Sequence, residues 1–88
     1  LGLTKYEFDV LCLLARHPGR VFSKEQIYAH AWENEIGNVD NAVRCVIASL
    51  RRKLRKYTDQ EYIQTVWGIG YKFKIPEAWV RPERKIKG

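Results

Sequence analysis

The chain has 88 residues, of which 45% are hydrophobic and 30% charged, with 16 Lys and Arg against 10 Asp and Glu. This length suits one folded domain, and the composition argues against intrinsic disorder. No stretch approaches the ~20 apolar residues of a membrane span, and no secretory signal opens the sequence. Because 2 cysteines are too few for a disulfide framework, we expect reduced thiols and a cytoplasmic protein. The absence of Met suggests a fragment of a longer protein.

The excess positive charge is concentrated in one segment. Residues 39–56 carry 6 basic and 1 acidic side chain, whereas residues 1–38 carry 4 basic and 5 acidic ones. A local basic stripe is typical of a protein that binds a polyanion. A charge run by itself more often marks a solvated helix face, so the context of this segment has to decide between the two interpretations.

The first helix is predicted over about residues 5–17. Thr4 and Glu7 have the spacing of a capping box, in which each side chain binds the backbone N–H of the other residue. Leu3 and Phe8 suit a hydrophobic staple across the same helix start. Apolar residues then follow helical spacing, with Phe8 among them, until a Pro-Gly pair stops the helix.

The second helix begins with the same pattern. Ser23 and Gln26 form a second capping box, and the apolar spacing after them extends to about Trp32. Residues 33–38 are polar and contain a glycine, so they predict a loop.

The third helix is predicted over about residues 40–56, with Asp40 or Asn38 as its cap. Its apolar residues recur at helical spacing and predict a buried stripe: Val43, Val46, Ile47, Leu50 and Leu54. The opposite face carries Asn41, Cys45, Ala48, Arg52 and Arg55, with Ser49 and Lys56 at one edge and Arg44 and Arg51 on the other flank. Small side chains in the middle of this face allow a close approach to another surface, which a purely solvated face does not need.

Two runs rich in β-branched and aromatic residues, 61–67 and 71–75, predict a β-hairpin that turns at Gly68-Ile69-Gly70. Residues 1–75 would then form one domain, and residues 76–88 a basic C-terminal tail. Three helices followed by a C-terminal hairpin make an α+β fold with the order of a winged helix-turn-helix. In that fold a helix fits the major groove, and the hairpin, here the wing at 62–75, reaches phosphates or the minor groove.

Several stretches resemble the OmpR/PhoB-type winged-helix effector domain of two-component response regulators. They are Leu3 to Phe8, His17 to Ser23, Leu50 to Leu54 and Tyr62 to Phe73. The resemblance implies sequence-specific binding of double-stranded promoter DNA in transcription regulation, with tandem dimers on direct repeats. It also implies a receiver domain, a sensor histidine kinase and an RNA polymerase contact through the loop after the second helix, with Glu33 and Glu35 as its charges. Family members usually carry a four-stranded sheet before the first helix, and this chain starts almost at that helix.

The candidate DNA contacts fall into three groups. For phosphates we expect Arg51, Arg52, Lys53 and Arg55, of which Arg52 could also bind guanine; the alternative for each is a solvated side chain or an intramolecular ion pair. For base edges we expect Asn41, Arg44, Cys45, Ala48 and Ser49, although many relatives have Arg in place of Ala48 and Ser49. The resemblance implies backbone contacts for Thr65 and Tyr71. Trp67 stands where relatives often place Arg for the minor groove, and we favour its packing against the fold over contact with sugars.

Other functions find little support in the sequence. No Cys or His spacing matches a metal site and no Gly-rich phosphate loop is present, so we expect no catalytic residue, no metal, no cofactor and no enzyme activity. The main alternative is a winged helix that docks its basic helix on an acidic protein partner. RNA binding is a second alternative, but the sheet lacks the aromatic platform typical of single-strand readers.

Overall fold

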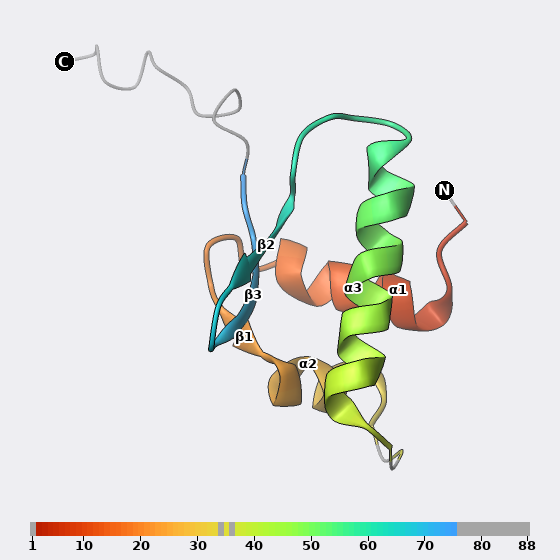
Figure 1. Ribbon diagram of the computed structural model, residues 1–88, viewed down its shortest axis with the longest axis vertical. Coiled ribbons are helices and arrows are strands. Elements are labelled where there is room, and N and C mark those ends of the chain that lie inside the picture. Colours follow the sequence, from red (N-terminus) through yellow and green to blue (C-terminus); the bar gives the residue numbers. More distant parts are fainter. Residues whose placement is uncertain (1, 34, 36, 76–88) are drawn as a thin grey trace, which may run out of the picture.

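The computed structural model describes residues 2–33, 35 and 37–75, so the predicted tail at 76–88 lies outside the described residues. The elements in chain order are α1 (Lys5–Ala15), β1 (Phe22–Ser23), α2 (Lys24–Ala31), α3 (Val39–Arg55), β2 (Ile63–Val66) and β3 (Gly70–Phe73). In Figure 1, α3 stands upright in front of α1, α2 lies across its lower end, and the small sheet lies beside it. The predicted order of three helices and a C-terminal hairpin is confirmed.

The predicted helix starts are also confirmed. Both capping boxes are present, with the Glu7 backbone N–H donating to Thr4 Oγ1 at 3.1 Å and the Gln26 N–H donating to Ser23 Oγ at 3.1 Å. The cap of α3 is Asn38, whose Oδ1 accepts from the N–H three residues later at 2.9 Å. These side chains satisfy backbone donors that the first turn of a helix leaves without partners.

The buried side of α1 differs from the prediction. The buried residues are Glu7, Val10 and Leu14, whereas Phe8 is 57% exposed, so its place in the buried face was wrong. The staple with Leu3 stays a prediction. Phe8 follows Glu7 by one position, which turns its side chain about 100° away from the core. A buried carboxylate in place of the phenyl ring gives α1 a polar contact with α3.

The sheet has a strand that the sequence did not predict. Its order is β1-β3-β2, and both pairings are antiparallel. β1 contains two residues, too few for a period-two pattern to show in the sequence. It nevertheless attaches the wing to the helices, because Phe22 pairs with Tyr71 and Ser23 pairs with Gly70. A Cβ atom at Gly70 would lie 1.9 Å from the Phe22 carbonyl oxygen, so this pairing requires glycine.

The core lies between the three helices and the inner face of the sheet. Its fully buried side chains include Leu14 of α1, Ile27 of α2, Ile63 of β2 and, from α3, Ile47 and Leu50. The predicted apolar stripe of α3 is confirmed, and its side facing away from the core is left for other contacts. No helix within the described ranges is both long and apolar enough to traverse a bilayer.

Candidate nucleic-acid interface

The face of α3 opposite the core is open to solvent. Its exposed residues are Asn41, Arg44, Cys45, Ala48, Arg52 and Arg55. They lie on the side predicted from helical spacing, with small side chains near the middle of the helix, Arg44 before them, and Arg52 and Arg55 towards the C-terminal end. A helix with small residues at its centre can come within contact distance of a groove floor, while the flanking arginines reach its rims.

The arginines of this face differ in how far they are engaged. No hydrogen bond or ion pair within the described residues involves the Arg52 side chain. Arg55 lies 3.9 Å from Glu61 and Arg44 lies 3.6 Å from Asp40, in pairs whose side chains are at least half exposed. Exposed pairs of this kind contribute little and exchange readily for another anion, so all three cations are available to a ligand.

The N-terminal end of α3 is tied to α2. Lys24 Nζ donates to Asp40 Oδ1 at 2.9 Å. The hydrogen bond from Lys24, with the positive charges of Lys24 and Arg44, holds the pKa of Asp40 below its ordinary value. The same hydrogen bond raises the pKa of Lys24. The acidic side chain of α3 is thus neutralised by its neighbours, and the open face keeps its positive character.

Arg51, predicted as a phosphate contact, instead reaches the wing. Its Nη2 donates to the Ile63 carbonyl oxygen at 3.0 Å and to Thr65 Oγ1 at 2.8 Å. The guanidinium carbon lies 6.0 Å from the centre of the Tyr71 ring. Its Nε is buried and has no hydrogen-bond partner, which shows how closely the side chain is enclosed. Arg51 therefore fixes the wing relative to α3, and its DNA contact stays a prediction.

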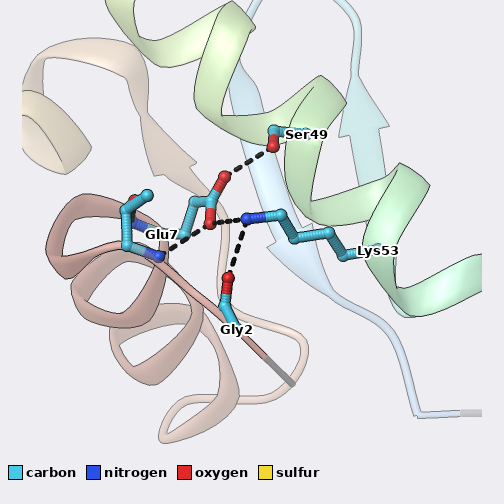
Figure 2. Close-up of polar contacts among 5 residues, drawn as sticks. Gly2, Glu7, Ser49 and Lys53 are labelled. Carbon is cyan, nitrogen blue, oxygen red and sulfur yellow. Dashed lines mark hydrogen bonds and ion pairs between the residues drawn. The ribbon is translucent and has the colours of Figure 1, made fainter.

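Ser49 and Lys53 face α1 rather than the open side of α3. Figure 2 shows both side chains converging on the Glu7 carboxylate. Lys53 Nζ lies 2.6 Å from Glu7 Oε1 and 3.0 Å from the Gly2 carbonyl oxygen, and the Ser49 hydroxyl donates to Glu7 Oε2. For Lys53 this is the intramolecular ion pair that was the alternative to a phosphate contact. The DNA contacts predicted for Ser49 and Lys53 stay predictions.

The Glu7 carboxylate is ionised at neutral pH in spite of its burial. Burial would raise its pKa, but hydrogen bonds from Lys53, Ser49 and the Thr4 backbone, with the charge of Lys53, lower the pKa to about 2. The sequence contained a signal for this site that was missed, because Glu7 shares the helical face of Val10 and Leu14. It was interpreted only as half of a capping box.

The wing forms the second wall of the candidate interface. Thr65 is half-buried and accepts the hydrogen bond from Arg51, and Tyr71 is 9% exposed and belongs to the core. Both side chains therefore have structural roles in the fold, and their contacts with the DNA backbone stay predictions. Trp67 is 88% exposed, so the expectation that it packs against the fold was wrong. The strands end at Val66 and resume at Gly70, which places Trp67 in the turn rather than in β2.

An open groove of about 930 Å³ separates α3 from the wing. Asn41, Arg44, Cys45, Ala48 and Arg51 line its helix side, and residues 65–71 line its wing side. Ile69, at the turn of the wing and 60% exposed, is a lining residue that the sequence interpretation missed. The groove brings the exposed α3 face and the wing to one side of the molecule.

The loop between α2 and α3 is anchored by stacked aromatic rings. Trp32 stacks on Tyr6 at 4.9 Å and on Tyr28 at 5.0 Å between ring centres. The Tyr6 hydroxyl donates to the Glu35 carboxylate, a hydrogen bond that raises the pKa of Tyr6. Glu33 is exposed and has a positive φ of 46°. The two predicted polymerase-contact residues therefore differ, since Glu35 is held by Tyr6, whereas no described residue holds the Glu33 carboxylate by a hydrogen bond.

Comparison with known proteins identifies the fold and the family. The family described as "Transcriptional regulatory protein, C terminal" matches residues 1–73. The chain belongs to this family. It is a family of regulatory, DNA-binding domains rather than of enzymes.

Individual relatives agree with this assignment. The chain is 42% identical over 73 residues to the uncharacterized transcriptional regulatory protein YcbL of Bacillus subtilis, covering 82% of this chain and 32% of that protein. It thus spans about a third of the length of such curated relatives. The DNA-binding domain of E. coli CadC superposes with a TM-score of 0.78 at 31% identity, covering 86% of this chain and 72% of that chain. The DNA-binding domain of E. coli CpxR superposes with a TM-score of 0.71 at 36% identity, covering 84% of this chain and 74% of that chain.

Proposed function

We propose that this winged-helix domain binds double-stranded promoter DNA in a sequence-specific manner, as the effector domain of a transcriptional response regulator. The outer face of α3 enters the major groove, and the wing contacts the adjacent backbone or minor groove. The observation that carries the proposal is the open, cationic face of α3, with Arg52 unengaged at its C-terminal half. Family membership and the likeness to the DNA-binding domains of CadC and CpxR support it.

The geometry suits a duplex better than a protein surface. Along the helix, the exposed residues Arg44 and Arg52 stand before and after the short side chains of Cys45 and Ala48, so the helix can approach a groove floor while its arginines reach phosphates. A duplex presents phosphates on both sides of the helix, whereas an acidic peptide needs cations on one side only. Docking on an acidic protein partner is the alternative function. It predicts binding to an acidic peptide and no binding to a duplex in the assay below.

The remaining features of the proposal concern the longer protein. We propose a cytoplasmic regulator with a receiver domain controlled by a sensor histidine kinase, bound to its operator as a tandem dimer. Glu33 is the better candidate for contact with RNA polymerase, because its carboxylate is exposed and the Glu35 carboxylate already accepts a hydrogen bond from Tyr6. We assign no catalytic step to the domain.

A salt titration of duplex binding tests the proposal. Fluorescence anisotropy with a labelled duplex, enriched from a random-sequence pool by the wild-type domain, should give log affinity that falls linearly with log salt concentration by about 0.9 per phosphate contact. Arg52→Ala should weaken binding to this duplex more than binding to a random duplex, because Arg52 can reach guanine as well as phosphate. Arg16→Ala is the matched control, since Arg16 is an exposed arginine at the end of α1 and does not belong to α3.

Two results would contradict the proposal. One is the absence of binding to any duplex by a folded wild-type domain, together with binding to an acidic peptide. The other is equal loss of duplex affinity in the Arg52 and Arg16 variants, because only the overall charge would then matter. If Arg52→Ala lost the same affinity for the enriched and the random duplex, Arg52 would contact phosphate but not guanine.

A further inference from the structure

Two large apolar side chains project from the tip of the wing. Trp67 is 88% exposed and Ile69 is 60% exposed. They flank Gly68, whose φ of +80° allows a tight turn, closed by the hydrogen bond from the Ile69 N–H to the Val66 carbonyl oxygen at 2.9 Å. No ring contact or hydrogen bond within the described residues engages the Trp67 side chain. The short turn therefore holds both side chains outward from the sheet.

The wing tip faces the same side as the candidate DNA-binding face. Trp67 and Ile69 line the groove whose other wall is Arg44, Cys45 and Ala48 of α3. Arg51 ties the wing strand to α3 through the Ile63 carbonyl oxygen, so the spacing between helix and tip is fixed before any ligand binds. A duplex that accepts α3 in its major groove therefore meets the wing tip at an adjacent groove.

The tip carries no charge with which to bind phosphate. Residues 65–71 contain no Lys, Arg, Asp or Glu. The contact that this tip can make is apolar, and the apolar surface of a duplex at its minor groove consists of the deoxyribose walls and the base edges. Proteins that place apolar side chains there widen the groove and unstack base steps.

We propose that Trp67 and Ile69 form an apolar wedge that packs on the deoxyribose walls of the minor groove, beside the major groove occupied by α3. The proposal rests on the proposed function and names how the wing reads the duplex. The wedge adds affinity without releasing counterions, because it neutralises no phosphate. It favours flanking sequences with deformable pyrimidine–purine steps over A-tracts, whose stiff and narrow minor groove suits an inserted cation but not an indole ring.

Substitutions at Trp67 separate the apolar contact from a charged one. Trp67→Ala should weaken binding to the enriched duplex about tenfold while leaving the slope of log affinity against log salt unchanged. Trp67→Arg should steepen the slope by about 0.9 and shift the flank preference towards A-tracts. Phe8→Ala is the matched control, because Phe8 is also an exposed aromatic residue but lies on α1. Thermal melts check that each variant folds.

The outcomes distinguish this proposal from the function on which it rests. If Trp67→Ala bound the enriched duplex with the same affinity as the wild-type domain, the wedge proposal would be overturned, but the proposed function would stand. A shallower salt slope in Trp67→Ala would also overturn it, because the wing would then act through charge. Equal preference of the wild-type domain for A-tract and pyrimidine–purine flanks would contradict the selectivity. Failure of the wild-type domain to bind any duplex would overturn the proposed function itself.

Discussion

Replacing Glu7 by Gln should destabilise the domain in a pH-dependent way. The substitution preserves the size of the side chain and removes the negative charge that Lys53 and Ser49 share. The amide can still accept hydrogen bonds, but it leaves Lys53 without its ionic partner. Because the Glu7 side chain is 6% exposed, water replaces little of the lost interaction.

The magnitude follows from the pKa of the carboxyl group. In the folded domain it is about 2, against 4.5 for an unperturbed group, a difference of about 2.5 units. Each unit corresponds to about 1.4 kcal/mol, so the ionised carboxylate contributes on the order of 3 kcal/mol at neutral pH. Lys53 is 27% exposed and can turn towards water in the variant, which reduces the expected loss to about 2–3 kcal/mol.

The sign of the pH dependence is fixed by the direction of the shift. A lowered pKa in the folded state stabilises the domain fully above the unfolded value of 4.5, and this stabilisation is lost as the pH falls towards 2. Urea unfolding followed by circular dichroism gives the free energy of unfolding of both proteins. The difference between wild type and Glu7→Gln should be about 2 kcal/mol smaller at pH 3 than at pH 7. Asp9→Asn is the control, since among the residues that the structure describes Asp9 pairs only with the exposed Lys5.

If the difference in free energy of unfolding between wild type and Glu7→Gln were the same at pH 7 and pH 3, this reasoning would be refuted. The loss would then come from altered packing of the amide rather than from a missing charge. An equally large, pH-dependent loss in Asp9→Asn would also refute it, because the effect would then be general to the acidic residues of α1.

Two further substitutions test the attachment of the wing. Arg51→Ala should lower the free energy of unfolding by about 1–3 kcal/mol through loss of the hydrogen bonds to Ile63 and Thr65, yet change the salt slope of DNA binding far less than Arg52→Ala does. A slope reduced by a full phosphate contact would show that Arg51 also binds phosphate. Gly70→Ala should lower the melting temperature sharply, because its Cβ would collide with the backbone of Phe22, and an unchanged melting temperature would show that β1 separates from β3 at little cost.

The helices were predictable because their signals are local. A cap and the residue three positions later lie in one turn, so Thr4, Ser23 and their partners could be identified from spacing alone. The amphipathic pattern of α3 was equally clear, with Val43, Ile47 and Leu50 at helical intervals. The open face of α3 followed from the same periodicity.

The remaining features depend on contacts between distant parts of the chain. The intramolecular bonds of Ser49 and Lys53 could not be predicted, because their partner, Glu7, lies more than forty positions away in the sequence. The bond from Arg51 to the wing could not be predicted either, because the carbonyl group that it binds cannot be located from α3 alone. Trp67 was expected to pack because an aromatic residue in a short chain usually does, and the position of the turn decided otherwise.

Chemical-shift mapping with the enriched duplex tests the central claim most directly. We predict that the backbone amides along the open face of α3, from Asn41 to Arg55, and those of the wing turn at 67–69 shift on titration, whereas the exposed side of α1 around Phe8 does not. Shifts confined to α1 or to the loop after α2, with the α3 amides unchanged, would contradict the assignment of α3 as the helix that reads DNA.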